Sequence, residues 1–263
     1  MIDLSEILNQ TIEIAKKAGE FIRKEAKTFD RSKIESKGLN DLVSYVDKEA
    51  EKIIVNRLKE ILPEADFIAE EGTAVQSGKE YTWIIDPLDG TTNFIHGIPI
   101  FAVSIGLKHK EELVLGVIYE VNFDECFYAS KGKGAYLNGE KIQVSKAKSL
   151  SESLIVTGFP YSAFDKIDDY LNILRSLMET CHGLRRLGSA ATDLCYVACG
   201  RSDGFFEYDL KPYDVAAGVV ILREAGGKVT DFDGGKDFLF GKTILASNSH
   251  IHQEFLGEVQ KIW

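Results

Sequence analysis

The sequence predicts an α+β protein whose two halves combine helices and strands differently. Two long helical patterns come first, and short strand patterns separated by turn residues follow them. From about residue 150 onward helices and strands alternate, which is typical of helices layered on a sheet. We therefore predict an N-terminal α+β half over residues 1–150 and a C-terminal α/β half over residues 151–263, joined near Ser145–Ser153.

Two amphipathic helices are predicted over residues 3–28 and 41–62, because apolar residues recur in both at intervals of three and four. The second helix is expected to end before Pro63, since proline lacks the amide proton that a helix interior needs. The segment between them, residues 32–41, is polar, and we predict a mobile loop there.

Short apolar or alternating runs after the second helix predict an antiparallel sheet. Turn segments such as His109–Glu112 and Asn122–Asp124 separate these runs, as in hairpins. The glycine-rich segment Gly132–Gly139 lacks the strand–turn–helix setting of a nucleotide site and is interpreted as another hairpin. The predicted strands of this half cover residues 67–69, 81–85, 101–107, 113–119 and 125–129.

The C-terminal half alternates between the two periodicities. Helices are expected near residues 165–180, 189–199 and 212–225, with a last one from Ser249. The strands between and after them are expected at residues 154–157, 184–187, 204–207, 228–231 and 244–246.

Composition places the chain among ordinary globular proteins. Of 263 residues, 44% are apolar and 27% charged, without an apolar run long enough to cross a membrane. The N-terminus lacks the layout of a signal peptide, and the four cysteines form no Cys-x-x-Cys pair. We therefore expect a cytoplasmic protein with reduced thiols and no membrane partner. The net charge of −10 argues against a general nucleic-acid binder, which needs a basic surface.

The most informative segment is Trp83–Phe94, in which an apolar run ends in two carboxylates, Asp86 and Asp89. Oxygen ligands at a rigid strand end suit hard cations such as Mg²⁺. The residues after Gly90 resemble a helix start, whose free amide groups favour an anion such as phosphate. Metal and phosphate would then meet within one turn of the chain.

Other carboxylates lie at the ends of predicted elements. Each of them could have a structural role instead of a functional one. Glu71 could be a turn residue, and Asp214 could be an acidic residue in the first turn of a helix. Asp86 could end a strand before proline. Taken together with Gly90–Thr91, they favour a shared cation site. The carboxylates concerned are Asp47, Glu70, Glu71, Asp86, Asp89 and Asp214.

Asp86–Phe94 closely resembles the signature of the inositol monophosphatase family of Mg²⁺-dependent, lithium-sensitive phosphatases. The resemblance extends in order over nearly the whole chain and implies the layered α-β-α-β-α sandwich of sugar phosphatases, with a large antiparallel sheet and a smaller mixed one. The further matching segments are Lys37, Asp41–Val43 and Asp47, Glu70–Gly72, Gly188–Ala191, Phe205–Glu207, Pro212–Gly218 and Glu224–Gly227.

The resemblance implies a set of metal ligands and catalytic residues. Two or three Mg²⁺ would be held by the side chains of Glu70, Asp86, Asp89 and Asp214 and by the backbone carbonyl of Leu88. A water attacks phosphorus in such enzymes, and the residues that orient or deprotonate it match Glu70, Thr91 and Asp47. The sequence leaves open which of these is the base. No catalytic histidine is required.

The resemblance also implies how substrate is bound. Phosphate would rest on the amide groups of Gly90 and Thr91, and Lys37 would lie in a loop near a third, weaker metal. The substrate-binding set as a whole is Lys37, Asp89, Gly90, Thr91, Arg186, Ala190, Glu207 and Asp214.

Arg185 and Arg186 leave two interpretations open. They could form a structural ion pair or subunit contact, or they could clamp a second phosphate or an acidic substituent. The sequence leaves open which of the two points into the cleft. The implied activity is hydrolysis of myo-inositol 1-phosphate or a similar polyol phosphate. The alternatives are a fructose-1,6-bisphosphatase, possibly bifunctional, and a non-catalytic phosphate-binding or regulatory homologue. The family is usually dimeric, so a homodimer is expected.

Overall fold

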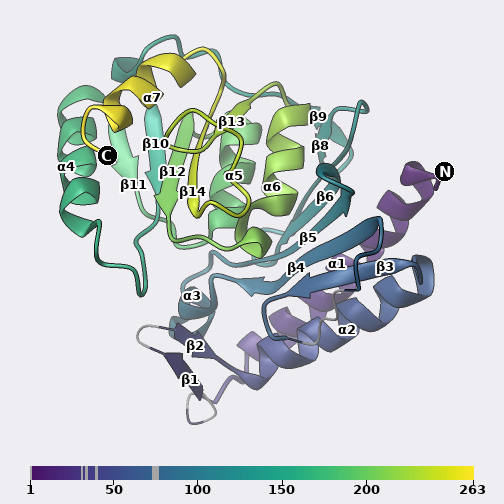
Figure 1. Cartoon of the computed structure of the whole chain (residues 1–263). Coiled ribbons are helices and arrows are strands. Elements are labelled where there is room, and N and C mark those ends of the chain that lie inside the picture. The colour runs from purple at the N-terminus through teal and green to yellow at the C-terminus, as the bar shows by residue number, and fades with distance from the viewer. Residues whose placement is uncertain (1, 31, 33–34, 39–40, 73–76) are drawn as a thin grey trace.

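The computed structural model in Figure 1 describes residues 2–30, 32, 35–38, 41–72 and 77–263 and has five layers. Two helices, α1 (Leu4–Ala26) and α2 (Tyr45–Ile61), cover the outer face of a seven-stranded sheet. The helices α5 (Ala190–Ala198) and α6 (Pro212–Glu224) lie between this sheet and a five-stranded one. The last layer holds α4 (Ile167–Thr180) and α7 (His252–Gln260). The predicted α-β-α-β-α order is confirmed.

The large sheet is antiparallel except at one edge. Its strands follow one another in the order β3-β4-β5-β6-β7-β8-β9, and every neighbouring pair is antiparallel apart from β3 and β4. The sheet is therefore mixed. The hairpin predicted at Gly132–Gly139 lies within β7–β9. The strands are β3 (Ala65–Ala69), β4 (Tyr81–Asp89), β5 (Ala102–His109), β6 (Glu112–Glu120), β7 (Glu125–Ser130), β8 (Ala135–Leu137) and β9 (Glu140–Ile142).

The second helix begins later than predicted. Residues 41–43 form β2 (Asp41–Val43), which pairs antiparallel with β1 (Glu35–Gly38), so part of the predicted loop is also a strand. The helix starts at Tyr45 because Ser44 caps it: the Ser44 hydroxyl accepts the Val46 amide, and the Asp47 carboxylate accepts the Ser44 amide. Lys37 lies in β1, but its side chain is outside the described residues.

The small sheet is mixed, as predicted, with the strand order β11-β10-β12-β14-β13. Its strand β10 is parallel to both neighbours, whereas β14 is antiparallel to β12 and β13. The last helix, α7, begins at His252 rather than near Ser249. The strands are β10 (Leu154–Thr157), β11 (Gly183–Arg185), β12 (Gly204–Tyr208), β13 (Lys228–Thr230) and β14 (Thr243–Ser247).

Small residues bring the middle layer close to the large sheet. A Cβ atom on Gly116 in β6 would overlap the backbone of Ala217 in α6, and one on Gly106 in β5 would lie 3.0 Å from the Ala216 Cβ. The helix therefore packs with its backbone against the strands, and the Ser104 hydroxyl of β5 donates to the Tyr213 carbonyl over 3.3 Å. This packing brings the N-terminus of α6, and with it Asp214, to the end of β4.

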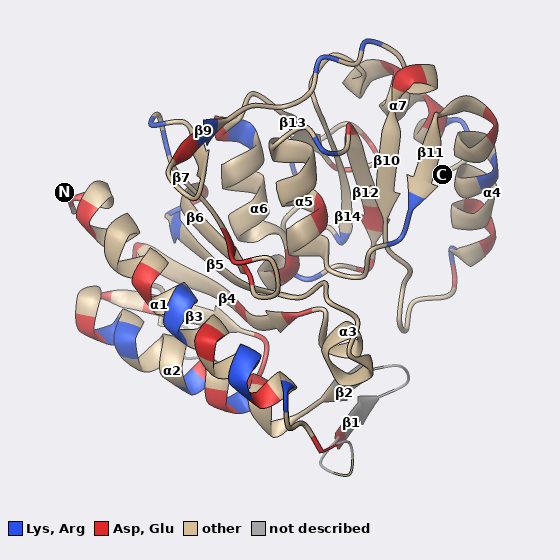
Figure 2. Cartoon of the chain, turned by 180° about the vertical axis from the view of Figure 1, so that it is seen from behind, with Lys and Arg blue, Asp and Glu red and all other residues tan. Residues whose placement is uncertain are grey.

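Charged residues of both signs alternate along the ribbons of α1 and α2 (Figure 2). Their inward faces are mainly apolar, with Ala18, Ile22 and Ile54 fully buried, and they include the buried polar residues Thr11, Asp47 and Glu51. Both helices are thus amphipathic, as their periodicity predicted. In the described part of the chain, we find no helix with the length and hydropathy needed to span a membrane.

Candidate active site

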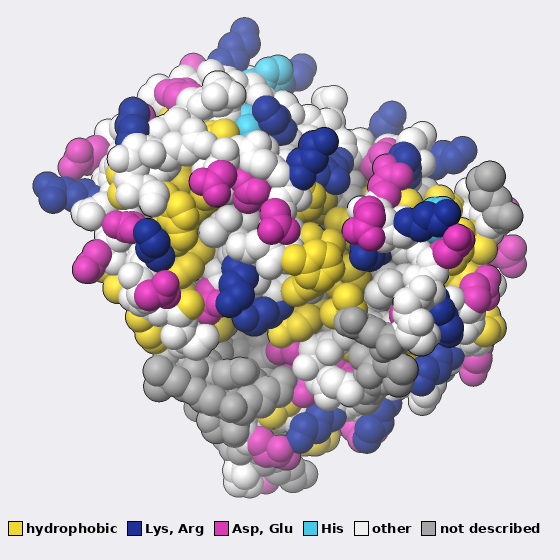
Figure 3. Space-filling view, in the orientation of Figure 1, with side chains coloured by type: hydrophobic (Ala, Val, Ile, Leu, Met, Phe, Trp, Pro, Cys, Tyr) yellow, Lys and Arg dark blue, Asp and Glu magenta, His cyan; other side chains and the backbone are white. Residues whose placement is uncertain are grey.

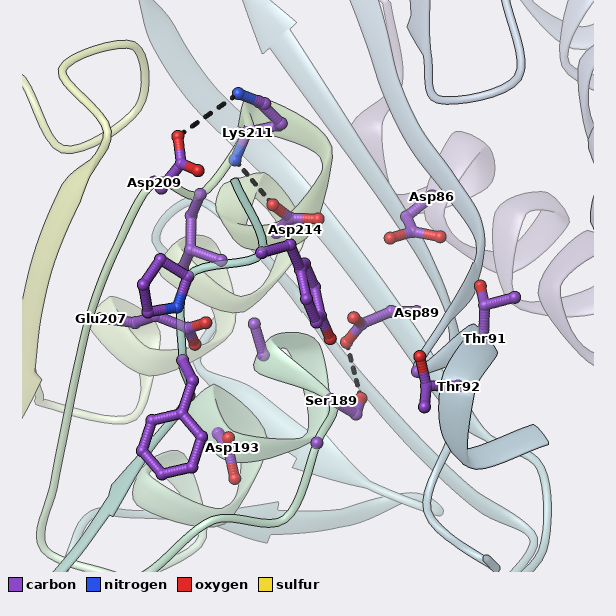
Figure 4. A pocket seen from close by; sticks show the side chains of 18 of the residues that line it. Asp86, Asp89, Thr91, Thr92, Ser189, Asp193, Glu207, Asp209, Lys211 and Asp214 are labelled. Carbon is purple, nitrogen blue, oxygen red and sulfur yellow. Dashed lines mark hydrogen bonds and ion pairs between the residues drawn. The ribbon is translucent and has the colours of Figure 1, made fainter. Parts of the chain in front are cut away.

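A cavity of about 230 Å³ opens where the two sheets approach each other. Its walls come from the end of β4, from α3 (Thr91–His96), from the N-terminal ends of α5 and α6, and from β12. The space-filling view shows hydrophobic side chains exposed beside basic and acidic ones on the face seen in Figure 1 (Figure 3). Figure 4 shows side chains that line the cavity, and the acidic ones labelled are Asp86, Asp89, Asp193, Glu207, Asp209 and Asp214.

An irregularity in β4 places Asp86 and Asp89 together. Residues three apart on a regular strand point to opposite faces of the sheet. Here Asp86 pairs with Ser104 and Asp89 with Ala102, so β4 carries one residue more than β5 between these pairs. The extra residue restores the common direction of the two carboxylates. A hydrogen bond stabilises this irregular part of β4: the Leu88 amide donates to Asp86 Oδ1 over 2.9 Å.

Asp86, Asp89 and Asp214 each offer an oxygen to one small volume. The three atoms lie within 4.8 Å of one another, and among the described residues these are the ones grouped closely enough to hold a common cation. Asp214 comes from the first turn of α6, where its Oδ2 accepts the Lys211 amide over 2.6 Å. No lysine or arginine of the described ranges makes a salt bridge to any of the three.

Glu70 stands next to this group without being one of the three. It lies one residue past β3, lines the same cavity, and its amide donates to the Ile85 carbonyl of β4 over 3.2 Å. Its charge contributes to raising the pKa of Asp86. All four predicted carboxylate ligands therefore line one cavity, and three of them form the close group.

Burial and mutual repulsion shift these carboxyl groups strongly. Burial raises the pKa of Asp86 well above its usual value, and the charges of Glu70, Asp89 and Asp214 add to the effect. Burial raises the pKa of Asp89 to about 6, although hydrogen bonds from Ser189 and Ala191 oppose it. Burial and the charge of Asp89 likewise raise the pKa of Asp214. A divalent cation would reverse this balance by favouring the ionised forms.

Thr91 joins the acidic strand end to α2. Its hydroxyl lies 2.9 Å from Asp47 Oδ1 and 3.0 Å from the Leu88 carbonyl, and its single proton can serve one of these acceptors at a time. Asp47 is only 1% exposed. Burial raises its pKa, while hydrogen bonds from Ser44 and Thr91 oppose the rise. Three of the predicted catalytic and ligand positions thus meet in one hydrogen-bonded group.

The predicted substrate residues of the described structure line the cavity from both halves of the chain, with Asp89, Gly90 and Thr91 from the N-terminal half and Arg186, Ala190, Glu207 and Asp214 from the C-terminal half. Ala190 begins α5, Glu207 lies in β12, and both line the cavity with Arg186. Arg186 is the cavity residue of the arginine pair: its guanidinium lies 3.3 Å from the Tyr161 hydroxyl and 5.7 Å from the centre of the Phe159 ring. Arg185 instead donates to the Leu184 carbonyl and is exposed.

Three polar residues in or near the site were not singled out as candidates from the sequence: Ser189 and Asp193 line the cavity, and Glu51 binds the turn that carries Glu70. Ser189 donates to Asp89 Oδ2 over 2.6 Å, and Asp193 lies on the cavity wall with Oδ1 buried and without a hydrogen-bond partner in the described structure. Glu51 is fully buried on α2 and accepts the Glu71 amide. Asp193 and Glu51 lie among apolar helix positions. A polar residue that interrupts an apolar helix face is the sequence feature that could have marked them as candidates.

A layered α-β-α-β-α fold with three clustered carboxylates between its sheets defines the class of sugar-phosphatase-like proteins. Within that class the chain belongs to the inositol monophosphatase family, whose family model matches residues 3–263. This confirms the family that the motifs indicated.

Individual relatives agree with this assignment. The chain is 45% identical over 243 residues to the Nus factor SuhB of Vibrio cholerae. The aligned region covers 92% of this chain and 91% of the relative. The crystal structure of the extragenic suppressor protein SuhB from Bartonella henselae superposes with a TM-score of 0.92 at 42% identity, over 97% of this chain and 99% of the other. The Thermotoga maritima IMPase gives a TM-score of 0.89 at 36% identity, with 98% of each chain covered.

The relatives' names concern the prediction, made from the net charge, that the protein has no nucleic-acid partner. The Vibrio cholerae relative is named a Nus factor rather than a phosphatase. The exclusion of a nucleic-acid partner, which the acidic net charge suggested, therefore has no support among the relatives. Net charge describes the whole surface and does not exclude a local binding face.

Proposed function

We propose that this protein is a Mg²⁺-dependent phosphatase that hydrolyses the phosphate monoester of a small polyol, with myo-inositol 1-phosphate as the leading substrate. The observation that supports this most directly is the group of Asp86, Asp89 and Asp214, whose oxygens lie within 4.8 Å of one another beside Thr91. Membership of the inositol monophosphatase family gives the reaction class.

The donor set suits Mg²⁺. All the candidate ligands are oxygens, and the carboxylates that repel one another here would be neutralised by divalent ions. We assign Asp86, Asp89, Asp214 and Glu70 as ligands, together with the Leu88 carbonyl, and we expect two or three ions per site. When bound, such ions lower the pKa of a coordinated water and stabilise the charge of the leaving oxygen.

The side chains around Thr91 are assigned to the attacking water. The Thr91 hydroxyl lies between Asp47 and the Leu88 carbonyl, so when it donates to Asp47 its lone pairs can accept a hydrogen bond from a water in the cavity. A proton taken from that water would pass through the hydroxyl to the Asp47 carboxylate, as the hydroxyl gives up its own proton. Asp47 would hold the hydroxyl in that orientation from its buried position. Glu70 is the second group able to orient or deprotonate the water, because it lines the same cavity.

The far wall is assigned to the polyol. Glu207 lies across the cavity from Thr91 in Figure 4, and Ala190 also lines the cavity. We expect Glu207 and Asp89 to accept hydroxyl protons of the substrate. The amides of Gly90 and Thr91 would bind the phosphate. Arg186 lines the cavity and could meet an anionic substituent, so a bisphosphate such as fructose 1,6-bisphosphate is the alternative substrate. The side chain of Lys37 is outside the described residues, and its role stays a prediction.

Phosphate release tests this proposal. We expect hydrolysis of myo-inositol 1-phosphate with Mg²⁺ and none after EDTA treatment. Fructose 1,6-bisphosphate, histidinol phosphate and adenosine 3′,5′-bisphosphate, assayed in parallel, would rank the substrates. Hydrolysis that continued unchanged in EDTA would exclude the metal-dependent mechanism.

The relatives' name favours a second candidate, a role as a Nus factor, which can accompany or replace catalysis. A Vibrio cholerae strain without its SuhB would distinguish the two. Rescue by both the wild-type chain and the Asp89→Asn variant, which we expect to lack hydrolysis, would assign the cellular role to binding. Rescue by the wild type alone would assign it to catalysis.

We further propose a homodimer in the cytoplasm. The four cysteines are free thiols, which fits a reducing compartment. Light scattering at micromolar concentration measures the assembly, and a mass of one chain, 29.3 kDa, would exclude the dimer.

A further inference from the structure

The turn that carries Glu70 is held on both sides by hydrogen bonds from other elements. Before the turn, the Glu70 amide donates to the Ile85 carbonyl of β4 over 3.2 Å. After it, the Glu71 amide donates to Glu51 Oε2 of α2 over 2.7 Å. Within the turn, Gly72 adopts a φ of +79° and its amide reaches the Ala69 carbonyl over 3.4 Å. The backbone around Glu70 is therefore fixed by β4 on one side and by Glu51 on the other.

Glu51 is an unusual residue to find at its position. It is 0% exposed, on the inward face of α2 where Ala50, Ile54 and Val55 are also buried. Burying a carboxylate costs desolvation free energy unless hydrogen bonds satisfy its oxygens. An apolar residue at the same position would carry no such cost. The bond that Glu51 accepts from the backbone of the Glu70 turn gives a physical reason for a carboxylate there.

Glu51 and Asp47 lie one helical turn apart and act on two different loops. Residues four apart share a helix face, so both carboxylates point from α2 toward the edge of the site. Asp47 accepts the Thr91 hydroxyl at the start of α3, whereas Glu51 accepts the amide that follows Glu70. One rigid helix thus contacts the two loops that lie on either side of the carboxylate group.

We propose that Glu51 is a positioning residue that holds Glu70 in place as a metal ligand. Glu51 touches no substrate and no reacting atom in this arrangement, and it acts through the Glu71 amide. The inference rests on the proposed function, because it takes Glu70 to be a ligand of Mg²⁺. Groups that orient metal ligands typically change metal affinity by about 10- to 100-fold when they are removed.

The experiment measures Mg²⁺ affinity by titration calorimetry on the full-length protein, independently of turnover. Glu51→Ala should weaken Mg²⁺ binding by about 10-fold or more, since the turn loses its second anchor. Glu51→Gln keeps an oxygen acceptor of the same length and should bind Mg²⁺ within about twofold of wild type. Glu60→Ala, on the exposed side of the same helix, is the matched control and should leave the Mg²⁺ affinity unchanged.

A double-mutant cycle identifies the path of the effect. If Glu51 acts through Glu70, adding Glu51→Ala to a Glu70→Ala protein should weaken Mg²⁺ binding no further. The proposal would be overturned if Glu51→Ala weakened Mg²⁺ binding as much in the Glu70→Ala protein as it does in the wild type. Wild-type Mg²⁺ affinity in the single Glu51→Ala variant would also overturn it. Should Glu51→Ala fail to fold, Glu51→Asp takes its place, because it keeps the charge but withdraws the acceptor by one methylene. It should also weaken binding, and full affinity there would refute the role.

Failure of this inference can be told apart from failure of the proposed function. A wild-type protein that neither binds Mg²⁺ nor releases phosphate contradicts the proposed function. A wild-type protein that does both, together with a Glu51→Ala variant of unchanged Mg²⁺ affinity, contradicts only the role of Glu51.

Discussion

The Asp89 carboxylate at the end of β4 accepts the hydroxyl proton of Ser189 over 2.6 Å, although the two residues are 100 positions apart. The same oxygen accepts the Ala191 amide over 2.7 Å, so Asp89 binds the N-terminus of α5. A carboxylate at a helix N-terminus is stabilised by the free amides and the helix dipole. These bonds leave the other oxygen of Asp89 for a cation, and they connect the large sheet to the middle helix layer.

Asp89→Asn should abolish most phosphatase activity while the fold survives. The amide keeps the size of the side chain but removes the charge that a divalent ion requires, so we expect kcat/KM to fall by about 100-fold or more. Steady-state kinetics and thermal denaturation measure the two effects. Asp233→Asn, an exposed aspartate outside the cavity, is the charge-matched control. Near wild-type turnover by Asp89→Asn would show that the ligand assignment is wrong.

The metal-free protein should lose stability as pH rises. Asp89 has a folded-state pKa of about 6, above its usual value, and the pKa values of Asp86 and Asp214 are also raised. A carboxyl group with a raised pKa contributes stability that is complete below the unfolded pKa of about 4 and is lost as pH rises through the folded value. Thermal denaturation in EDTA should therefore give a lower Tm at pH 8 than at pH 5.

Mg²⁺ should remove most of that pH dependence, because bound cations favour the ionised carboxylates and add binding free energy to the folded state. We expect the largest increase of Tm with Mg²⁺ at pH 8 and a small one at pH 5. The Asp89→Asn variant is the control, since it lacks one of the titrating groups. Equal increases at both pH values would contradict the coupling between protonation and metal binding.

Periodicity predicts most helices and strands because these are local patterns, and it places Asp86 and Asp89 after a strand and Asp214 at a helix start. The order of the layers and the roles of these carboxylates are implied by the family resemblance instead. Their geometry could not be predicted in the same way. The irregularity at Pro87–Leu88 turns Asp89 to the side of Asp86, and a regular strand would have separated them.

The errors also have physical reasons. The periodicity of the second helix runs on through Leu42, so the helix was extended over a strand, although Ser44 and Asp47 have the spacing of a capping box. The β3–β4 pair is parallel although only residues 70–80 connect the two strands, and parallel strands usually need a longer crossover. Ser189 caps α5 locally by accepting the Thr192 amide, but its bond to Asp89 is a tertiary contact, as is the bond of Glu51 to the Glu71 amide. Periodicity contains no information on such contacts.

Thr91→Val should lower kcat with little effect on the fold. Valine keeps the shape of threonine but removes the hydroxyl that lies 2.9 Å from Asp47, so the attacking water loses its acceptor. We expect kcat to fall by about 10²- to 10⁴-fold, the range typical of general acid–base groups. Thr91→Ser restores the hydroxyl and should recover most of the activity. Turnover by Thr91→Val equal to that of Thr91→Ser would exclude Thr91 from the proton transfer.

Gly90→Ala should destabilise the protein and disturb the start of α3 more than the same change at Gly97. Both glycines have positive φ, +94° and +72°, so alanine strains the backbone at either position by about 1–2 kcal/mol. Only at Gly90 does a Cβ meet neighbours, 3.0 Å from the Ile100 carbonyl and 3.2 Å from the Gly188 carbonyl, whereas Gly97 has open space. Because the Gly188 loop leads into Ser189, the added contact should push α5 away from Asp89. Urea denaturation and Mg²⁺ titration of both variants measure this, and equal effects at the two positions would show that backbone strain alone selects glycine at Gly90.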